Sequence, residues 1–183
     1  KEKIKIEESK KRILDCCKVG EELGAYVVVF HPGYYSKMDK EETYQNIKKA
    51  ILEIKGEIKK NSWKINIAAE TTGKVNVFGS VEEIHRLVEE TKCSFTIDFA
   101  HILAREKTVD YDKIKKLFGK YKSWHCHFSG IEYTEKGERK HKKTGKENWK
   151  KLLENLPKDK EIVIINESPY NVEDSIEGLS LIK

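Results

Sequence analysis

The sequence has few cysteines and no long hydrophobic run. Its four cysteines are Cys16, Cys17, Cys93 and Cys126. None of them forms a C-x-x-C pair or a disulfide framework, which favours a reducing, cytoplasmic setting. No apolar stretch approaches the ~18 residues of a membrane span, so we expect no membrane segment. A signal peptide, a linker, a low-complexity segment and a sequence repeat are also absent. Because the sequence begins at Lys1 rather than Met, we expect the true N-terminus to be missing from it.

The composition is that of a folded domain with a highly charged surface. The 183 residues are 38% hydrophobic and 37% charged, enough for one domain with a real core across residues 1–183. The net charge of +5 is compatible with a polyanionic partner but does not require one.

Segments with the pattern of strands and of helices alternate along the chain. The expected strands are short and almost continuously apolar, which is typical of a parallel sheet covered by helices. They cover Tyr26–Phe30, Lys64–Ala69, Cys93–Ile97, Ser123–Phe128 and Glu161–Asn166. The expected helices cover Ile4–Leu23, Lys40–Lys60, a segment opened by a Ser80/Glu83 capping box, a segment from Asp110 to Phe118, Glu147–Leu156 and Val172–Lys183. This order predicts an α/β fold with five βα units.

An acidic residue or a histidine stands at or near the carboxyl end of every expected strand. These five residues are His31, Glu70, Asp98, His125 and Glu167. In a (β/α) barrel these strand ends form a single rim, where active sites are built. Five such residues on five strands are more than packing alone predicts, so we expect their side chains to converge on one face.

Three of the six histidines lie between Ser123 and His141. In a strand, His125 and His127 point to one face, and Trp124 and Cys126 to the other. The following loop carries Glu138 and His141, and Asp98 forms a D-x-x-H pair with His101.

All these side chains offer nitrogen or oxygen ligands, which suit Zn²⁺, Mn²⁺ or Fe²⁺. The alternative is a polar network satisfied by its own hydrogen bonds. We favour a rim that binds several metal ions.

Tyr34, Tyr35 and Lys37 follow the His31-Pro-Gly turn on the same rim. They are candidates for contacting a phosphate backbone, although tyrosines are also ordinary loop residues.

Six short motifs in this order resemble the endonuclease IV family of abasic-site endonucleases. They are Phe30-His-Pro-Gly33, Ala69-Glu-Thr-Thr-Gly73 with Gly79 beyond it, Ile97-Asp-Phe-Ala-His101, His125-Cys-His-Phe-Ser129, His141 with Gly145, and Asn166-Glu-Ser-Pro169. Each motif is weak alone, but six in order across nearly the whole chain are specific. The resemblance implies a TIM barrel that cleaves DNA at abasic sites with three zinc ions.

The resemblance also assigns roles to residues. Glu70 would bridge two metals, with His31 completing the first site. Asp98, His125 and Glu167 would hold the second metal, and His101 and His141 the third. The position of Ser129 gives the ligand place to His125 and leaves His127 as a supporting residue where the family has Asn. Glu70 or Glu167 would orient the nucleophile.

The chain departs from the family pattern at the third metal. The family has Asp-x-His there, whereas the residue two before His141 is Arg139, and the loop is one residue longer. We expect Glu138 to replace the aspartate. If it does not, the site would hold two ions, and the basic loop with Arg139 would help to bind phosphate.

The number of strands is also smaller than in the family. An eight-stranded barrel takes about 250 residues, and only five strands are visible here. The sequence therefore predicts a partial barrel whose open edges are completed by a longer protein or another chain.

Three functions fit this pattern. The first is a metal-dependent phosphodiesterase acting on abasic DNA, with Zn²⁺ or Mn²⁺. The second is a sugar isomerase or epimerase of the xylose-isomerase-like barrels, which place Glu, Asp, His and Glu around one or two metals. The third is a non-catalytic barrel remnant. The additional histidines, His31, His101 and His141, favour the first.

Overall fold

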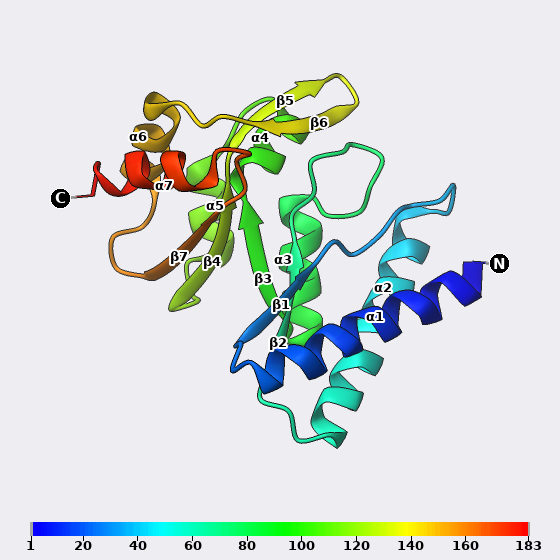
Figure 1. Cartoon of the computed structure of the whole chain (residues 1–183). Coiled ribbons are helices and arrows are strands. Elements are labelled where there is room, and N and C mark those ends of the chain that lie inside the picture. Colours follow the sequence, from blue (N-terminus) through cyan, green and yellow to red (C-terminus); the bar gives the residue numbers. More distant parts are fainter. Residues whose placement is uncertain (1, 183) are drawn as a thin grey trace.

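The computed structural model describes residues 2–182, and the side chains from residue 4 onward (Figure 1). Five strands form one parallel sheet in the order β1-β2-β3-β4-β7, and two more form an antiparallel hairpin. The elements are α1 (Glu2–Glu22), β1 (Val27–Phe30), α2 (Lys40–Lys60), β2 (Asn66–Glu70), α3 (Val81–Thr91), β3 (Ser94–Asp98), α4 (Phe99–Glu106), α5 (Tyr111–Phe118), β4 (Ser123–Phe128), β5 (Gly130–Thr134), β6 (Gly137–Lys142), α6 (Lys146–Asn155), β7 (Glu161–Asn166) and α7 (Asn171–Leu179).

The five predicted strands and the α/β class are confirmed. Spatial order follows chain order, and every connection in the sheet is a crossover between parallel strands, as in part of a (β/α) barrel. The last helix ends at Leu179, earlier than the predicted end at Lys183, a residue that lies outside the described part of the chain. No helix in residues 2–182 is long and apolar enough to cross a membrane.

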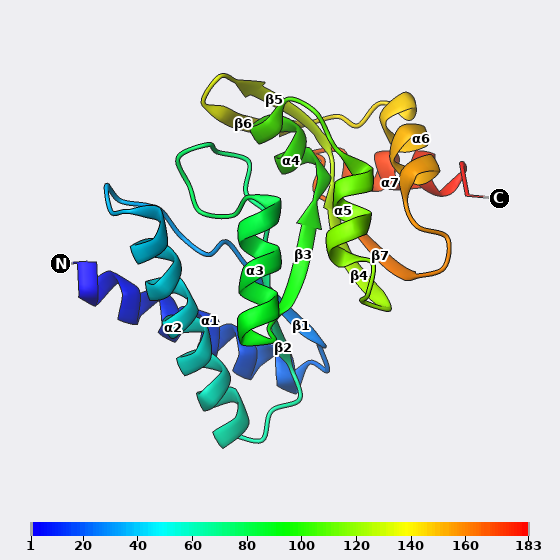
Figure 2. The ribbon, with the colours of Figure 1, turned by 180° about the vertical axis from the view of Figure 1, so that it is seen from behind.

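One face of the sheet is covered by helices, as the view from behind shows with α3 and α5 in front of the strands (Figure 2). Alternate residues of the strands point into this layer and are almost fully buried, among them Ile67, Ile97, Trp124 and Cys126. The helices contribute apolar stripes such as Ile84, Leu87 and Val88 of α3. The predicted capping box is present: Ser80 accepts from the Glu83 amide and Glu83 from the Ser80 amide.

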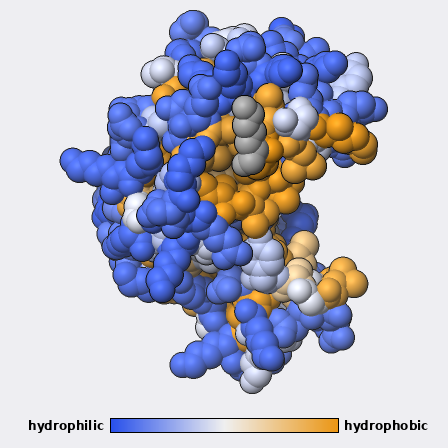
Figure 3. Space-filling view, turned by 90° about the vertical axis from the view of Figure 1, so that its left-hand side faces the viewer, coloured by the Kyte–Doolittle hydropathy of each residue, from blue (hydrophilic) through white to orange (hydrophobic). Residues whose placement is uncertain are grey.

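The other face of the sheet is exposed at β7, whereas Ala68 of β2 and Thr96 of β3 are buried on it. On β7, Val163 and Ile165 are 38% and 43% exposed, although a closed barrel would fill its interior with such residues. Figure 3, seen from the side that carries β7 and α7, shows apolar surface beside a hollow in the molecule. Val172, Ile176 and Leu179 of α7 are also exposed.

Two elements differ from the prediction. Helix α4 begins directly after Asp98, whose side chain caps it by accepting from the His101 amide at 2.7 Å. The segment after β4, expected to be a loop, forms the β5–β6 hairpin. Its second strand, Gly-Glu-Arg-Lys-His-Lys, has no apolar alternation, so contacts with the rest of the chain hold it in place.

Candidate metal centre

Eight polar side chains gather at the carboxyl ends of the parallel strands. The end of β1 supplies His31, β2 Glu70, β3 Asp98, β4 His127 and β7 Glu167, while α4 adds His101 and β6 adds Glu138 and His141. Parallel strands end at the same edge of a sheet, which brings these distant residues together. They form three overlapping clusters, and in each cluster the potential ligand atoms lie within 4.8 Å of one another.

The largest cluster consists of Glu70, Asp98, His127 and Glu167. The His127 Nδ1 atom lies 3.0 Å from Glu70 Oε1 and 3.1 Å from Glu167 Oε1. Ionised carboxylates only accept, so His127 donates to them. An imidazole proton thus occupies the space between two carboxylates, where a metal cation would compensate the same charges.

The structure places His127, and not the predicted ligand His125, among the clustered side chains. In the sheet, His127 is paired with Asp98, whereas His125 is paired with Thr96. Since a strand rises about 3.3 Å per residue, His125 lies roughly one layer below the rim. It belongs to none of the three clusters. Its Nδ1 instead lies 2.9 Å from the Tyr26 hydroxyl, and it lines a separate cavity of about 630 Å³.

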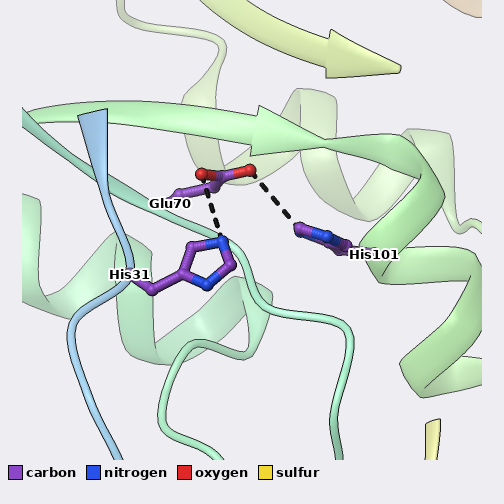
Figure 4. Close-up of side chains that lie close together, drawn as sticks. All are labelled: His31, Glu70 and His101. Atoms are coloured by element: carbon purple, nitrogen blue, oxygen red, sulfur yellow. Dashed lines mark ion pairs between the residues drawn. The ribbon is translucent and has the colours of Figure 1, made fainter. Parts of the chain in front are cut away.

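The second cluster joins His31, Glu70 and His101, whose side chains point toward one another in Figure 4. Glu70 Oε2 lies 3.3 Å from His31 Nε2, and Glu70 Oε1 lies 3.5 Å from His101 Nδ1. Glu70 Oε1 also contacts His127 of the first cluster, so Glu70 belongs to both clusters. This is the arrangement that a carboxylate shared between two cations requires.

The third cluster consists of His101, Glu138 and His141. His101 Nδ1 lies 3.0 Å from the Thr71 carbonyl, which can only accept, so this nitrogen carries the proton. Ser129 Oγ donates to the Gly130 carbonyl and so accepts from His141 Nδ1, at 2.6 Å. In the neutral form of both rings, which a bound cation would favour, Nε2 is the unprotonated nitrogen, and it faces the Glu138 carboxylate at 3.5 and 3.9 Å. Fixing the tautomer through the other nitrogen is how proteins orient metal-binding histidines.

Contacts between carboxylates and imidazoles shift the pKa values of the residues in these clusters. Burial opposes ionisation of Glu70, but hydrogen bonds from His101, His127 and His31 outweigh it and hold its pKa well below the usual range. Burial also disfavours the charged form of His127, yet its bonds to Glu167 and Glu70 raise its pKa to about 10. The same competition, with Glu70 as main partner, raises the pKa of His101 to about 9.

Asp98 gives the clearest indication that the residues fit a metal. Its side chain is 0% exposed, and Oδ2 has no hydrogen-bond partner. Burial raises its pKa to about 6. His101 Nδ1 lies 3.4 Å from Oδ2, within ion-pair range but without a hydrogen bond. A buried carboxylate oxygen without a hydrogen bond is costly, whereas a bound cation would satisfy it. The donors, four carboxylates and four imidazoles in total, suit Zn²⁺ or Mn²⁺.

The residues predicted to contact a phosphate backbone are placed differently from one another. Tyr34 and Lys37 are exposed in the loop after β1. Arg139 is also exposed and pairs with Glu132 at 2.9 Å. Tyr35 departs from the prediction: its hydroxyl donates to Glu83 at 2.6 Å, and its ring packs against the Phe78 ring. It anchors the loop rather than facing outward.

Sequence reasoning missed the supporting partners Thr71 and Ser129 and assigned His127 a supporting place. The H-x-H spacing puts both histidines on one face, so only strand register could tell which one reaches the rim. Thr71 and Ser129 both fall inside motifs, but nothing in the sequence shows that they bond to His101 and His141.

Comparisons with known proteins agree with this architecture. An uncharacterized protein of Methanocaldococcus jannaschii is 36% identical over 189 residues; the match covers 97% of this chain and 61% of the relative. The chain therefore spans less than two thirds of that relative's length.

Solved structures share the fold at low identity. An AP endonuclease of family 2 from Brucella melitensis superposes with a TM-score of 0.63 at 11% identity, covering 96% of this chain and 69% of that one. A D-tagatose 3-epimerase-like protein gives 0.60 at 21%, covering 96% and 67%. The IolI protein with a binding zinc atom gives 0.56 at 15%, covering 93% and 65%.

Residues 1–183 match the sequence pattern of a protein family described as "xylose isomerase-like TIM barrel". The match extends over the whole chain and agrees with the parallel sheet and its polar rim. The chain belongs to the xylose isomerase-like TIM barrel family.

Proposed function

We propose that this chain carries the metal centre of a phosphodiesterase that cleaves DNA at abasic sites, as in endonuclease IV. The observation that carries the proposal is the number of clusters: three overlapping sets of ligands meet at one rim. An enzyme that abstracts a proton at one or two metals has no need for His31, His101 and His141 together. Hydrolysis of a phosphodiester uses several cations to bind both the attacking and the leaving oxygen.

Metal ions bound here would polarise a phosphate and lower the pKa of a water molecule. Glu70 belongs to two clusters and would hold neighbouring cations together. Glu167 also lies between two clusters, because its Oε1 faces His127 and its Oε2 lies 3.9 Å from His141 Nε2. Either carboxylate could orient the attacking water. Tyr34, Lys37 and Arg139 would contact the DNA backbone from the exposed loops around the rim.

A specific observation favours a second candidate, a sugar isomerase or epimerase. Glu70, Asp98, His127 and Glu167 form the one four-membered cluster in residues 2–182, and this set could hold a single metal without the others. Glu70 and Glu167 would then be the groups that exchange protons with a bound sugar.

The test combines elemental analysis of the purified protein with two activity assays. We expect two or three Zn²⁺ or Mn²⁺ ions per chain and nicking of a duplex with one abasic site, with no nicking of the intact duplex. The control is Glu147→Gln, an exposed residue of α6, which should retain full activity. A single ion together with C-3 epimerisation of ketoses would replace the first proposal by the second.

A further inference from the structure

Glu138 reaches the third cluster although its spacing from His141 is wrong for a regular strand. Residues i and i+3 of a strand point to opposite faces, yet Glu138 and His141 both face His101. The pairing between β5 and β6 explains this. Glu132 pairs with Lys140 and Tyr133 with Glu138, so one step along β5 corresponds to two steps along β6.

Arg139 is the extra residue of this β-bulge. A bulge inserts one extra residue, bends the strand locally and changes the direction of neighbouring side chains. Arg139 points outward to Glu132, at 2.9 Å, and Glu138 turns to the side of His141. The bulge thereby accommodates the extra residue that this chain has before His141.

The loop after β2 fixes the same part of the hairpin. The Glu138 amide donates to the Gly73 carbonyl at 2.9 Å, and Lys74 forms a bridge with Gly137. Gly137 has a φ of +95°, and a Cβ there would lie 2.2 Å from the Gly73 carbonyl oxygen. The hairpin backbone therefore lies directly against Gly73.

Gly73 is glycine because of space rather than backbone conformation. The φ angle of Gly73 is not positive, so alanine could adopt its backbone angles. A Cβ at Gly73 would lie 2.7 Å from Glu138 Cβ, 2.8 Å from Glu138 Oε2 and 3.1 Å from His101 Cδ2. The Glu138 carboxylate occupies the space that any larger residue at position 73 would fill.

We propose that Gly73 and the bulge at Arg139 are positioning elements that hold the Glu138 carboxylate as a divalent-cation ligand beside His101 Nε2 and His141 Nε2. This inference rests on the proposed metal centre. Neither residue touches the cation; both act through Glu138.

The first experiment measures metal content and affinity with Zn²⁺ alone, in the wild type and in Gly73→Ala. We expect the weakest-bound ion to lose about 10- to 100-fold in affinity, the range for residues that orient ligands, while the other ions remain. Gly56→Ala is the matched control, since a Cβ at this exposed glycine of α2 meets nothing within 4 Å. It should bind all ions as the wild type does.

A double variant separates positioning from a general folding defect. If Gly73→Ala unfolds because it collides with Glu138, then Gly73→Ala with Glu138→Gly should recover the thermal stability of the metal-free protein. It should still lack the weakest-bound ion. Failure to recover stability would show that position 73 is constrained by something other than Glu138 and would overturn the inference.

Moving the carboxylate from position 138 to position 139 tests the role of the bulge. In Glu138→Ala with Arg139→Asp, the carboxylate stands two residues before His141, but the bulge directs it outward, so we expect no recovery of the lost ion. Recovery would mean that no bulge forms. A wild type that binds no Zn²⁺ would overturn the proposed centre itself, whereas a wild type with all ions and an equally competent Gly73→Ala would overturn only this inference.

Discussion

The two faces of the five-stranded parallel sheet carry different kinds of side chain. Toward the helices, Ile67, Ile97 and Trp124 are at most 2% exposed. On the opposite face, the strands end in Glu70, His127 and Glu167. Because neighbouring residues of a strand point to opposite faces, each strand contributes to stability with one set of residues and to chemistry with the other. The comparison implies that substitutions on the two faces should have separable effects.

The largest effect is expected on the polar face, from Glu70→Gln. An amide cannot hold two cations as a carboxylate does, so metal-dependent cleavage should fall at least about a thousandfold, a cost of several kcal/mol. The far-ultraviolet circular dichroism of the variant should match that of the wild type. Turnover at the wild-type rate, with metal present, would refute the bridging role.

Trp124→Ala should do the opposite of Glu70→Gln: it should reduce stability and leave metal binding by the folded protein intact. Trp124 is 2% exposed, and its Nε1 donates to the Phe118 carbonyl. Its removal should lower the free energy of unfolding by about 3–5 kcal/mol, measured by denaturant titration, while the folded fraction keeps its metal content. Lys116→Ala, at an exposed position of the same region, is the control. Equal stability of the two variants would contradict the separation of the faces.

A smaller and more specific effect should distinguish the two histidines of β4. We expect His127→Ala to weaken metal binding at least about a hundredfold, the upper end of what residues supporting a ligand cost. His125→Ala should leave the affinity nearly unchanged, because His125 lies one layer below and faces Tyr26. Competition titration with a chelating dye measures both. The reverse order would restore His125 as the ligand.

The smallest effect is expected from Glu83→Gln, in the first turn of helix α3. Burial opposes ionisation of Glu83, but hydrogen bonds from Tyr35 and from the Gly79 and Ser80 amides lower its pKa. A lowered pKa contributes stability above the unfolded value of about 4.3, which is lost as the pH falls through the folded value. Glu83→Gln should therefore cost about 1–2 kcal/mol at pH 7.

The difference between wild type and Glu83→Gln should shrink below about pH 4, near the unfolded pKa. Urea titrations at pH 7 and pH 3 measure it. Glu135→Gln, an exposed residue of the β5–β6 turn, should show no such difference. A constant difference across this range would show that Glu83 acts through its shape rather than its charge.

Most of the fold could be predicted because it follows from local pattern. The boundaries of α2, β4 and β7 agree with the prediction to the residue, since apolar runs and caps mark them. Helix α4 was missed because it follows β3 without a loop, with Asp98 both ending the strand and capping the helix. β6 was missed because it lacks apolar alternation and is a strand through its pairing with β5.

The sequence by itself determined the alternation of strands and helices and the placement of Glu70, Asp98 and Glu167 at strand ends, because hydrophobic period and turn signals are local. Only the tertiary structure decided that His127 rather than His125 reaches the rim, since register is a relation between strands. It also decided that Glu138 faces His101, because the bulge depends on how β6 pairs with β5, and the space beside Gly73 is filled by Glu138 only where these distant segments meet.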